Sequence, residues 1–215
     1  MTEQLTEAPS TDGRVRRGDR TRRVVLARAV DLASVEGLDG LSIGRLATDL
    51  AISKSGLISH FGTKEGLQLA TIRAARAIFV QTVIAPALAT PPGLGRVRAL
   101  LDAWLEYSSD RRFPGGCFFA RASHEHAARP GAVRDALAAL DEEWLGLIAE
   151  TIAGAQEVGE IAADVDPVQL AYELDAYLDS ANLRSLLGRR GVYDQAVRAV
   201  RGRLQSVAEP QRPAR

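Results

Sequence analysis

The sequence feature that most constrains this fold is a stretch of 23 residues from Ser42 to Lys64. Its first part places four apolar residues at the i, i+3, i+4 and i+7 spacing of one helix face, namely Ile43, Leu46, Ala47 and Leu50. Ser53 then offers a hydroxyl that can accept a hydrogen bond from a free N–H of a following helix. Leu57 and Phe61 lie four residues apart and would pack against the first helix. The stretch therefore predicts two short helices joined by a tight turn.

The outward face of the second predicted helix is short, polar and cationic. It carries Ser53, Lys54, Ser55, Ser59 and His60, and Gly56 allows another surface to come close. A helix pair of this kind is typical of a helix-turn-helix, whose second helix enters the DNA major groove. The spacing alone leaves an alternative, because any tight helix pair in an all-helical protein would bury the same apolar positions.

Composition and cysteine usage exclude several classes of protein. Aromatic residues make up 5% of the 215 residues, and no alternating apolar pattern of useful length predicts a strand. The single cysteine, Cys117, excludes an intrachain disulfide and a multi-cysteine zinc site, and a buried thiol is its simplest interpretation. No apolar run approaches the roughly 20 residues of a membrane span and no signal sequence is recognisable, so we expect a cytoplasmic protein.

The net charge of the chain is zero, but the charges are unevenly placed. Between Arg14 and Arg76, twelve Lys and Arg residues stand against six acids. A cationic N-terminal third on a neutral protein is typical of a nucleic-acid-binding module joined to another domain. Residues 1–20 have little to bury, so we predict a disordered basic arm. Two interpretations of its arginines remain open: contact with DNA phosphates or a minor groove, and a solvated tail.

Residues 21–67 resemble the N-terminal DNA-binding domain of the TetR family of bacterial transcriptional regulators. The positions in register are Thr21, Gly37, Leu41, Ser42, Leu46, Ala47, Ser53, Lys54, Leu57, His60, Phe61, Lys64 and Leu67. The resemblance implies DNA contacts from Ser42, Ser53, Lys54, Ser55, Gly56, Ser59, His60 and Lys64. It implies further that His60 and Lys64 contact phosphates and that Ser59 lies nearest the bases.

Three residues depart from the family pattern. Ile58 stands where many members have a tyrosine that contacts the DNA backbone, so one polar contact is missing. Ala51 occupies a turn position that is commonly glycine, and a positive φ there would cost about 1 kcal/mol. Gly44 lies inside the first helix of the motif and costs about 1 kcal/mol relative to alanine.

The remainder of the chain predicts six further helices, which gives nine in all. A long helix is expected from Lys64 to Ala85, where Pro86 would end it. Apolar stripes then predict helices near residues 97–108, 117–124 and 133–152. Asp166 followed by Pro167 predicts the start of a helix that ends near residue 187, and the last helix spans 193–209.

These elements predict an all-α fold in four parts. They are a disordered basic arm over 1–20, a three-helix helix-turn-helix domain over 21–67, a six-helix bundle over 68–209, which the resemblance implies is a ligand-binding and dimerisation domain, and a disordered tail over 210–215. The resemblance implies that the bundle binds a small molecule and that its last two helices pair with those of a second copy. Such a homodimer would present two recognition helices about 34 Å apart to a palindromic double-stranded DNA operator.

Aromatic and polar residues near the middle of the bundle are candidates for its ligand site. These candidates are Trp104, Phe118, Arg121, His124, Trp144 and Tyr172. Aromatic residues at such positions equally serve as core, and polar ones as surface. His124 and His126 lack the i, i+4 spacing of a zinc protease, so we expect no metal site. We find no nucleophile with an adjacent base and no phosphate-binding loop, and expect neither catalysis nor a cofactor.

The sequence thus predicts a dimeric transcription regulator, a repressor that a small-molecule ligand releases from its operator. The alternative is a helical small-molecule or partner-binding protein whose helix-turn-helix no longer binds DNA specifically. Ile58 and Gly44 are the residues that favour this alternative, because both weaken the motif.

Overall fold

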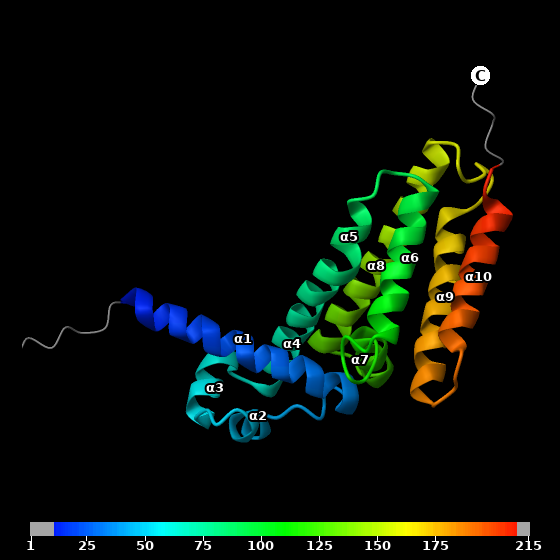
Figure 1. The fold of residues 1–215 in the computed structure, drawn as a ribbon. Helices are drawn as coiled ribbons and strands as arrows, with labels where there is room; N and C mark the ends of the chain where they lie inside the picture. Colours follow the sequence, from blue (N-terminus) through cyan, green and yellow to red (C-terminus); the bar gives the residue numbers. More distant parts are fainter. Residues whose placement is uncertain (1–10, 210–215) are drawn as a thin grey trace, which may run out of the picture.

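The computed structural model describes residues 11–209 of the chain. Its first three helices form a small bundle at one end of the molecule, and α1 extends outward from it (Figure 1). These helices are α1 (Thr11–Glu36), α2 (Ile43–Asp49) and α3 (Lys54–Phe61). We call this bundle the foot. The all-α prediction is confirmed, since residues 11–209 contain helices and no strand.

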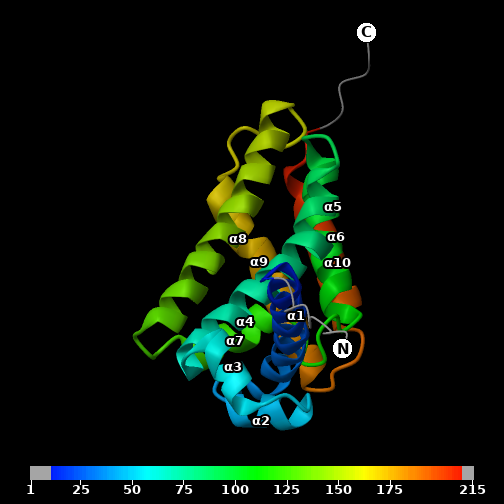
Figure 2. The same cartoon turned by 90° about the vertical axis from the view of Figure 1, so that its left-hand side faces the viewer.

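The remaining helices stand upright on the foot and form the body (Figures 1 and 2). They are α4 (Lys64–Phe79), η1 (Val80–Ile84), α5 (Ala85–Leu88), α6 (Leu94–Ser109), α7 (Phe118–His126), α8 (Ala132–Glu157), α9 (Pro167–Leu186) and α10 (Val192–Val207). Because α4, η1 and α5 follow one another without a break, the described chain has nine helices, as expected. The pair α9 and α10 lies along one side of the body (Figure 1).

Helix α1 begins at Thr11, earlier than the start at Thr21 that the sequence predicts. It starts at Thr11, so residues 11–20 are helical rather than part of a disordered arm. Extending a helix that is already nucleated costs little, and the packed part of α1 supplies the nucleus. The predicted arm over residues 1–10 and the predicted tail over 210–215 lie outside the described residues.

The long helix after Lys64 does not end at Pro86, which corrects a second boundary. It continues to Leu88, and the π-helical turn Val80–Ile84 precedes the proline. Proline has no N–H to donate, and a π turn changes the local hydrogen-bond register, so the ring is accommodated at the start of α5. This helix is long and apolar enough to cross a membrane, but 44% of its most apolar window is buried. It packs against α1, α6 and α8, as the central helix of the body.

Several helix ends follow from the capping residues that the sequence offers. Ser42 accepts a hydrogen bond from the Arg45 N–H, and Ser53 accepts one from the Gly56 N–H. Asp166 accepts bonds from the first turn of α9, and Gly37 ends α1 with φ of 83°. Each cap satisfies backbone groups that a helix end leaves without partners.

Foot and body share one continuous apolar core. On the foot side Leu38, Leu41 and Leu57 are at most 1% exposed, and the cluster continues through Leu67 into the body. The turn before α7 touches the end of α1, where the Gly115 N–H donates to Ser34 Oγ at 3.1 Å. A methyl group on Gly115 would overlap the carbonyl oxygen of Ser34. The two parts are therefore in contact at backbone level.

Replacing Gly115 with alanine should lower the free energy of unfolding by about 1 to 3 kcal/mol, because the backbone at this contact has to move apart. The measurement is a urea unfolding curve. Gly146→Ala on α8 is the matched control, because a methyl group there meets no atom within 4 Å. It should be neutral or stabilising by up to about 1 kcal/mol. Equal stability of Gly115→Ala and wild type would contradict the close contact.

Candidate nucleic-acid interface and ligand pocket

The recognition face of α3 points away from the molecule. Lys54, Ser55 and Ser59 are exposed, whereas Leu57 is 1% and Phe61 8% exposed on the opposite side. Ser59 Oγ donates to the Gly56 carbonyl at 2.7 Å, so this hydroxyl is anchored on its own helix. Lys54 has no ion-pair partner among the described side chains. The face thus combines one available cation with short polar groups.

Arg22 of α1 fixes the back of the recognition helix. Its guanidinium donates to the His60 carbonyl oxygen at 2.8 Å and lies 4.9 Å from the centre of the Phe61 ring. The His60 side chain is half-buried at the end of α3. Ser42, at the start of α2, is exposed while its hydroxyl caps that helix. The foot is therefore held as one unit by contacts from α1.

Lys64 occupies a different place from the other predicted DNA-binding residues. It begins α4, and its Nζ donates to the Asp39 carbonyl oxygen at 2.7 Å. Two arginines of the basic third are also engaged, because Arg28 pairs with Asp49 at 2.9 Å and Arg45 pairs with Glu36. These three cations consequently hold other parts of the protein in place.

The three departures from the family pattern have visible consequences. Ala51 has φ of 52°, so this turn residue adopts the left-handed conformation at a cost of about 1 kcal/mol. The Ile58 side chain is 45% exposed on α3. Gly44 has open space where a Cβ would lie, so no contact requires a glycine there.

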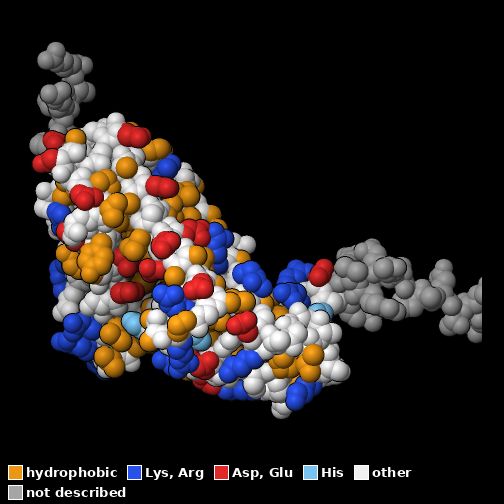
Figure 3. Space-filling model, turned by 180° about the vertical axis from the view of Figure 1, so that it is seen from behind, with side chains coloured by type: hydrophobic (Ala, Val, Ile, Leu, Met, Phe, Trp, Pro, Cys, Tyr) orange, Lys and Arg blue, Asp and Glu red, His pale blue; other side chains and the backbone are white. Residues whose placement is uncertain are grey.

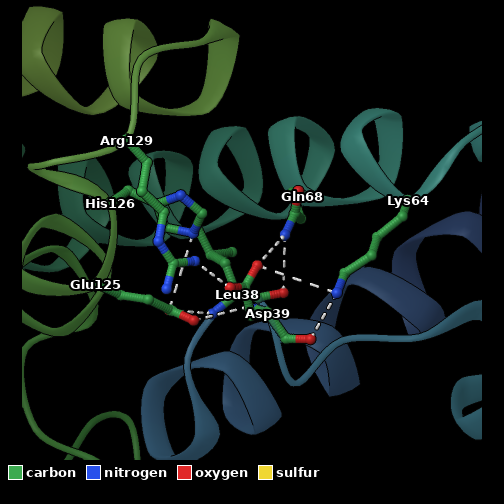
Figure 4. A network of polar contacts seen from close by, with 7 residues as sticks. All are labelled: Leu38, Asp39, Lys64, Gln68, Glu125, His126 and Arg129. Carbon is green, nitrogen blue, oxygen red and sulfur yellow. Dashed lines mark hydrogen bonds and ion pairs between the residues drawn. The ribbon is translucent and has the colours of Figure 1, made fainter.

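A polar network joins the foot to the body, and we call it the junction (Figure 4). The Glu125 carboxylate on α7 accepts hydrogen bonds from the backbone N–H of Leu38, at 2.6 Å, and of Asp39, at 3.0 Å. Gln68 of α4 donates to the Leu38 carbonyl at 3.0 Å. The loop between α1 and α2 is thereby bonded to both α4 and α7.

Charged groups complete the junction around Asp39. Its carboxylate pairs with Arg129, and this hydrogen bond holds the pKa of Asp39 below its usual range. Asp39, Glu125 and His126 offer ligand atoms within 4.8 Å of one another, a grouping suitable for a metal ion. However, the Glu125 oxygens already accept two N–H groups, and Arg129 and Lys64 place positive charge beside Asp39. Hydrogen bonds and ion pairs of the junction therefore already engage the carboxylates of Asp39 and Glu125.

A cavity of about 110 Å³ lies in the body, between the π turn after α4 and helices α6, α7, α8 and α9. Four aromatic residues line it, namely Phe79, Trp104, Phe119 and Trp144. The Phe79 ring lies edge-on to Trp144 at 5.2 Å and to Phe119 at 5.6 Å. The cavity therefore has rigid apolar walls of the kind that small-molecule sites use.

The six predicted ligand residues divide equally between the cavity and other places. Trp104, His124 and Trp144 line it. Phe118 is fully buried against Phe113 and Phe119, behind the cavity wall. Arg121 is exposed on α7, and Tyr172 is 64% exposed on the outward side of α9. Phe118 is therefore a core residue, and Arg121 and Tyr172 are surface residues, which are the alternatives that the sequence left open.

Carboxylates also line this cavity, and we did not predict them as ligand-site residues from the sequence. Burial and the nearby Asp179 raise the pKa of Asp175 to about 6, and burial also raises the pKa of Asp179 and of Asp141. Asp175 Oδ1 accepts a hydrogen bond from Trp144 Nε1 at 2.8 Å. The spacing Asp141–Trp144 and Asp175–Asp179 places each pair on one helix face, which is the signal that sequence reasoning had at hand.

Cys117 lines the cavity, and Asn182 is bonded to its backbone. Burial raises the pKa of the Cys117 thiol to about 12, so the thiol stays protonated at neutral pH. Asn182 Oδ1 accepts hydrogen bonds from the Cys117 N–H at 3.0 Å and from Ser108 Oγ at 3.1 Å. Cys117 is thus a buried structural thiol.

Comparison with known proteins identifies both parts of the molecule. Residues 25–71 match "Bacterial regulatory proteins, tetR family", and residues 93–200 match "Tetracyclin repressor-like, C-terminal domain". No curated protein matches the sequence significantly.

Solved structures share the fold across most of the chain. A TetR transcriptional regulator from Chloroflexus aurantiacus is 24% identical with a TM-score of 0.82, covering 90% of this chain and 98% of its own. A TetR-family regulator from Streptomyces coelicolor is 27% identical with a TM-score of 0.73, covering 90% and 97%. A putative regulator from Saccharomonospora viridis, solved in complex with choline, is 24% identical with a TM-score of 0.70, covering 89% and 100%.

The foot carries a helix-turn-helix with its recognition face outward, the body contains a cavity with aromatic walls, and the two parts match the N-terminal and C-terminal domain models of one family. The chain belongs to the TetR family of bacterial transcriptional regulators.

Proposed function

We propose that this protein is a repressor that binds a palindromic double-stranded DNA operator as a homodimer and leaves it when a small molecule fills the cavity of the body. The observation that carries the proposal is α7, which lines the cavity through His124 and bonds the foot through the next residue, Glu125. One short helix therefore contacts both the ligand site and the DNA-binding unit.

The exposed face of α3 supports the DNA-binding part of the proposal. Lys54, Ser55 and Ser59 are free of other elements, and nothing in the described chain covers them. In a helix-turn-helix these residues would enter the major groove, while Ser42 and the half-buried His60 lie beside phosphates. Lys64 would reach DNA only by leaving the Asp39 carbonyl, so we assign it a smaller share of binding.

An apolar face on α9 supports the homodimer. Five large apolar side chains of this helix and of the residue that caps it are between 45% and 73% exposed in the single chain: Val168, Tyr172, Leu183, Leu186 and Leu187. A face of this kind marks an interaction surface. Pairing of α9 and α10 with the same helices of a second copy would bury it and would fix two recognition helices relative to each other.

The switch follows from the position of α7. A ligand that needs more room than the empty cavity offers would displace α7, and Glu125 would then move away from the amides of Leu38 and Asp39. A ligand that prefers the displaced state 100-fold contributes about 2.7 kcal/mol towards release. The spacing of the two recognition helices would no longer match successive major grooves.

At the start of α3 the Lys54 ammonium would also neutralise a phosphate at the edge of the groove. We therefore predict that Lys54→Ala flattens the salt dependence of DNA binding by about 0.9 log units per log unit of salt, because this phosphate contact is lost. The measurement is fluorescence anisotropy with DNA from upstream of the protein's own gene, titrated at several KCl concentrations. Arg98→Ala removes the same charge from an exposed site on α6, at the far end of the body, and should leave the slope unchanged. Equal slopes for both variants would contradict the assigned interface.

We predict that Glu125→Ala lowers specific DNA affinity by an order of magnitude, about 1.4 kcal/mol, while affinity for random DNA of equal length stays the same. Without the carboxylate the foot is held less firmly, so placing both recognition helices costs more entropy. Competition between upstream and random DNA measures the ratio. Glu106→Ala, an exposed glutamate on α6, is the control. An unchanged ratio in Glu125→Ala would show that the junction does not position the foot.

The carboxylates of the cavity generate a pH prediction. Burial raises the pKa of Asp175 to about 6, so the folded protein binds this proton more tightly than the unfolded chain, and Asp175 costs stability as pH rises from about 4 to 6. Asp175→Asn should therefore be more stable than wild type at about pH 7.5, by an order of 1 to 3 kcal/mol, and similar near pH 4. Thermal melting at both pH values tests this, with the exposed Asp102→Asn as control. A destabilised Asp175→Asn at neutral pH would reverse the sign.

A further inference from the structure

The cavity carries more negative charge than its surroundings neutralise. Four carboxylates line it, from Asp141 and Glu143 on α8 and from Asp175 and Asp179 on α9. Of these only Glu143 has a basic partner, since it pairs with Arg76, which also lines the cavity. Acidic and apolar side chains lie side by side over the middle of the body (Figure 3). Three carboxylates thus face the cavity without a cation of their own.

His124 on α7 also lines the cavity, together with Arg76 and Cys117, and it does not cancel this charge. The charge of His124 lowers the pKa of Asp179 against the opposing effect of burial. No ion pair joins His124 to Asp179 among the described side chains. Even a protonated His124 would leave an excess of carboxylates around the cavity.

The aromatic side chains of the cavity, like its carboxylates, favour a positively charged ligand. The faces of Phe79, Phe119 and the two tryptophans carry the negative potential of their π systems, which attracts cations within about 6 Å of the ring centre. The Asp175 carboxylate holds the Trp144 indole by its N–H, so the ring is fixed in the wall. Carboxylates and aromatic side chains thus line the same cavity.

We propose that the ligand of this cavity is a small organic cation, an amine or quaternary ammonium attached to an apolar body that fits between the aromatic walls. The inference rests on the proposed function, because it names the ligand class of the same site. A neutral ligand would desolvate the carboxylates without compensation, and an anion would be repelled by them. A cation removes the repulsion among Asp141, Asp175 and Asp179 as it binds.

The test compares two compounds of equal shape that differ in charge, phenyltrimethylammonium and tert-butylbenzene. Both tryptophans of the chain, Trp104 and Trp144, line the cavity, so quenching of intrinsic fluorescence reports occupancy without DNA. The cation should bind at least about tenfold more tightly than its neutral counterpart at neutral pH. Weaker or equal binding of the cation, or no saturable quenching by it up to about 10 mM, would overturn the proposal.

Variants that each remove one carboxylate test whether the preference for the cation arises in the cavity. Asp179→Asn and Asp175→Asn should each lower the preference for the cation by about threefold or more, and together by about tenfold or more. Asp102→Asn on α6 removes an equal charge outside the cavity and should retain the full preference. A similar loss in all three variants would mean that the net charge of the protein attracts the cation, and the cavity would not be its site.

A separate titration of the cation into the protein–DNA complex distinguishes the two proposals. Release of upstream DNA supports the switch and the ligand class together. Tight, aspartate-dependent binding of the cation without release would uphold the ligand class and overturn the switch. DNA binding combined with failure of the fluorescence test would overturn the ligand class and leave the DNA-binding function in place.

Discussion

Two hydrogen bonds from backbone amides to one carboxylate join the foot of this molecule to its body. Glu125 accepts the N–H groups of Leu38 and Asp39, at the point where the foot meets the body. The Leu38 amide is partly buried, and a buried amide without an acceptor costs about 1 to 3 kcal/mol, so the carboxylate on α7 stabilises the loop in this place. The recognition helix is therefore connected through this loop to α7, which also forms one wall of the cavity.

Local rules account for what the sequence predicts well. The helix-turn-helix follows from apolar spacing and from two serine caps, which act within three residues, and both caps are present at Ser42 and Ser53. The Asp166–Pro167 helix start is correct for the same reason. The boundary at Pro86 is wrong because a π turn, which no local pattern announced, accommodates the proline. The early start of α1 reflects helix propagation beyond the packed residues.

The functional contacts depend on pairs far apart in the sequence, and single-sequence patterns carry little information about these. Glu125 and its partner Leu38 lie 87 residues apart in the sequence. The stretch His124-Glu125-His126, taken by itself, gives no indication of this contact. Of the four aromatic candidates, Trp104 and Trp144 line the cavity, whereas Phe118 lies in the core and Tyr172 is exposed. The acidic residues of the cavity could not be grouped from the sequence, because they lie on two helices, α8 and α9, that come together only in the folded chain.

Amide hydrogen exchange at Leu38 and Asp39 reports on the junction itself, since Glu125 is the acceptor for both groups. We expect slow exchange in the wild-type protein and a marked acceleration at these two amides in Glu125→Ala, with the amide of Leu46 in α2 unchanged. Fast exchange of Leu38 and Asp39 in the wild type, or equal rates in the variant, would contradict a foot that is held by α7.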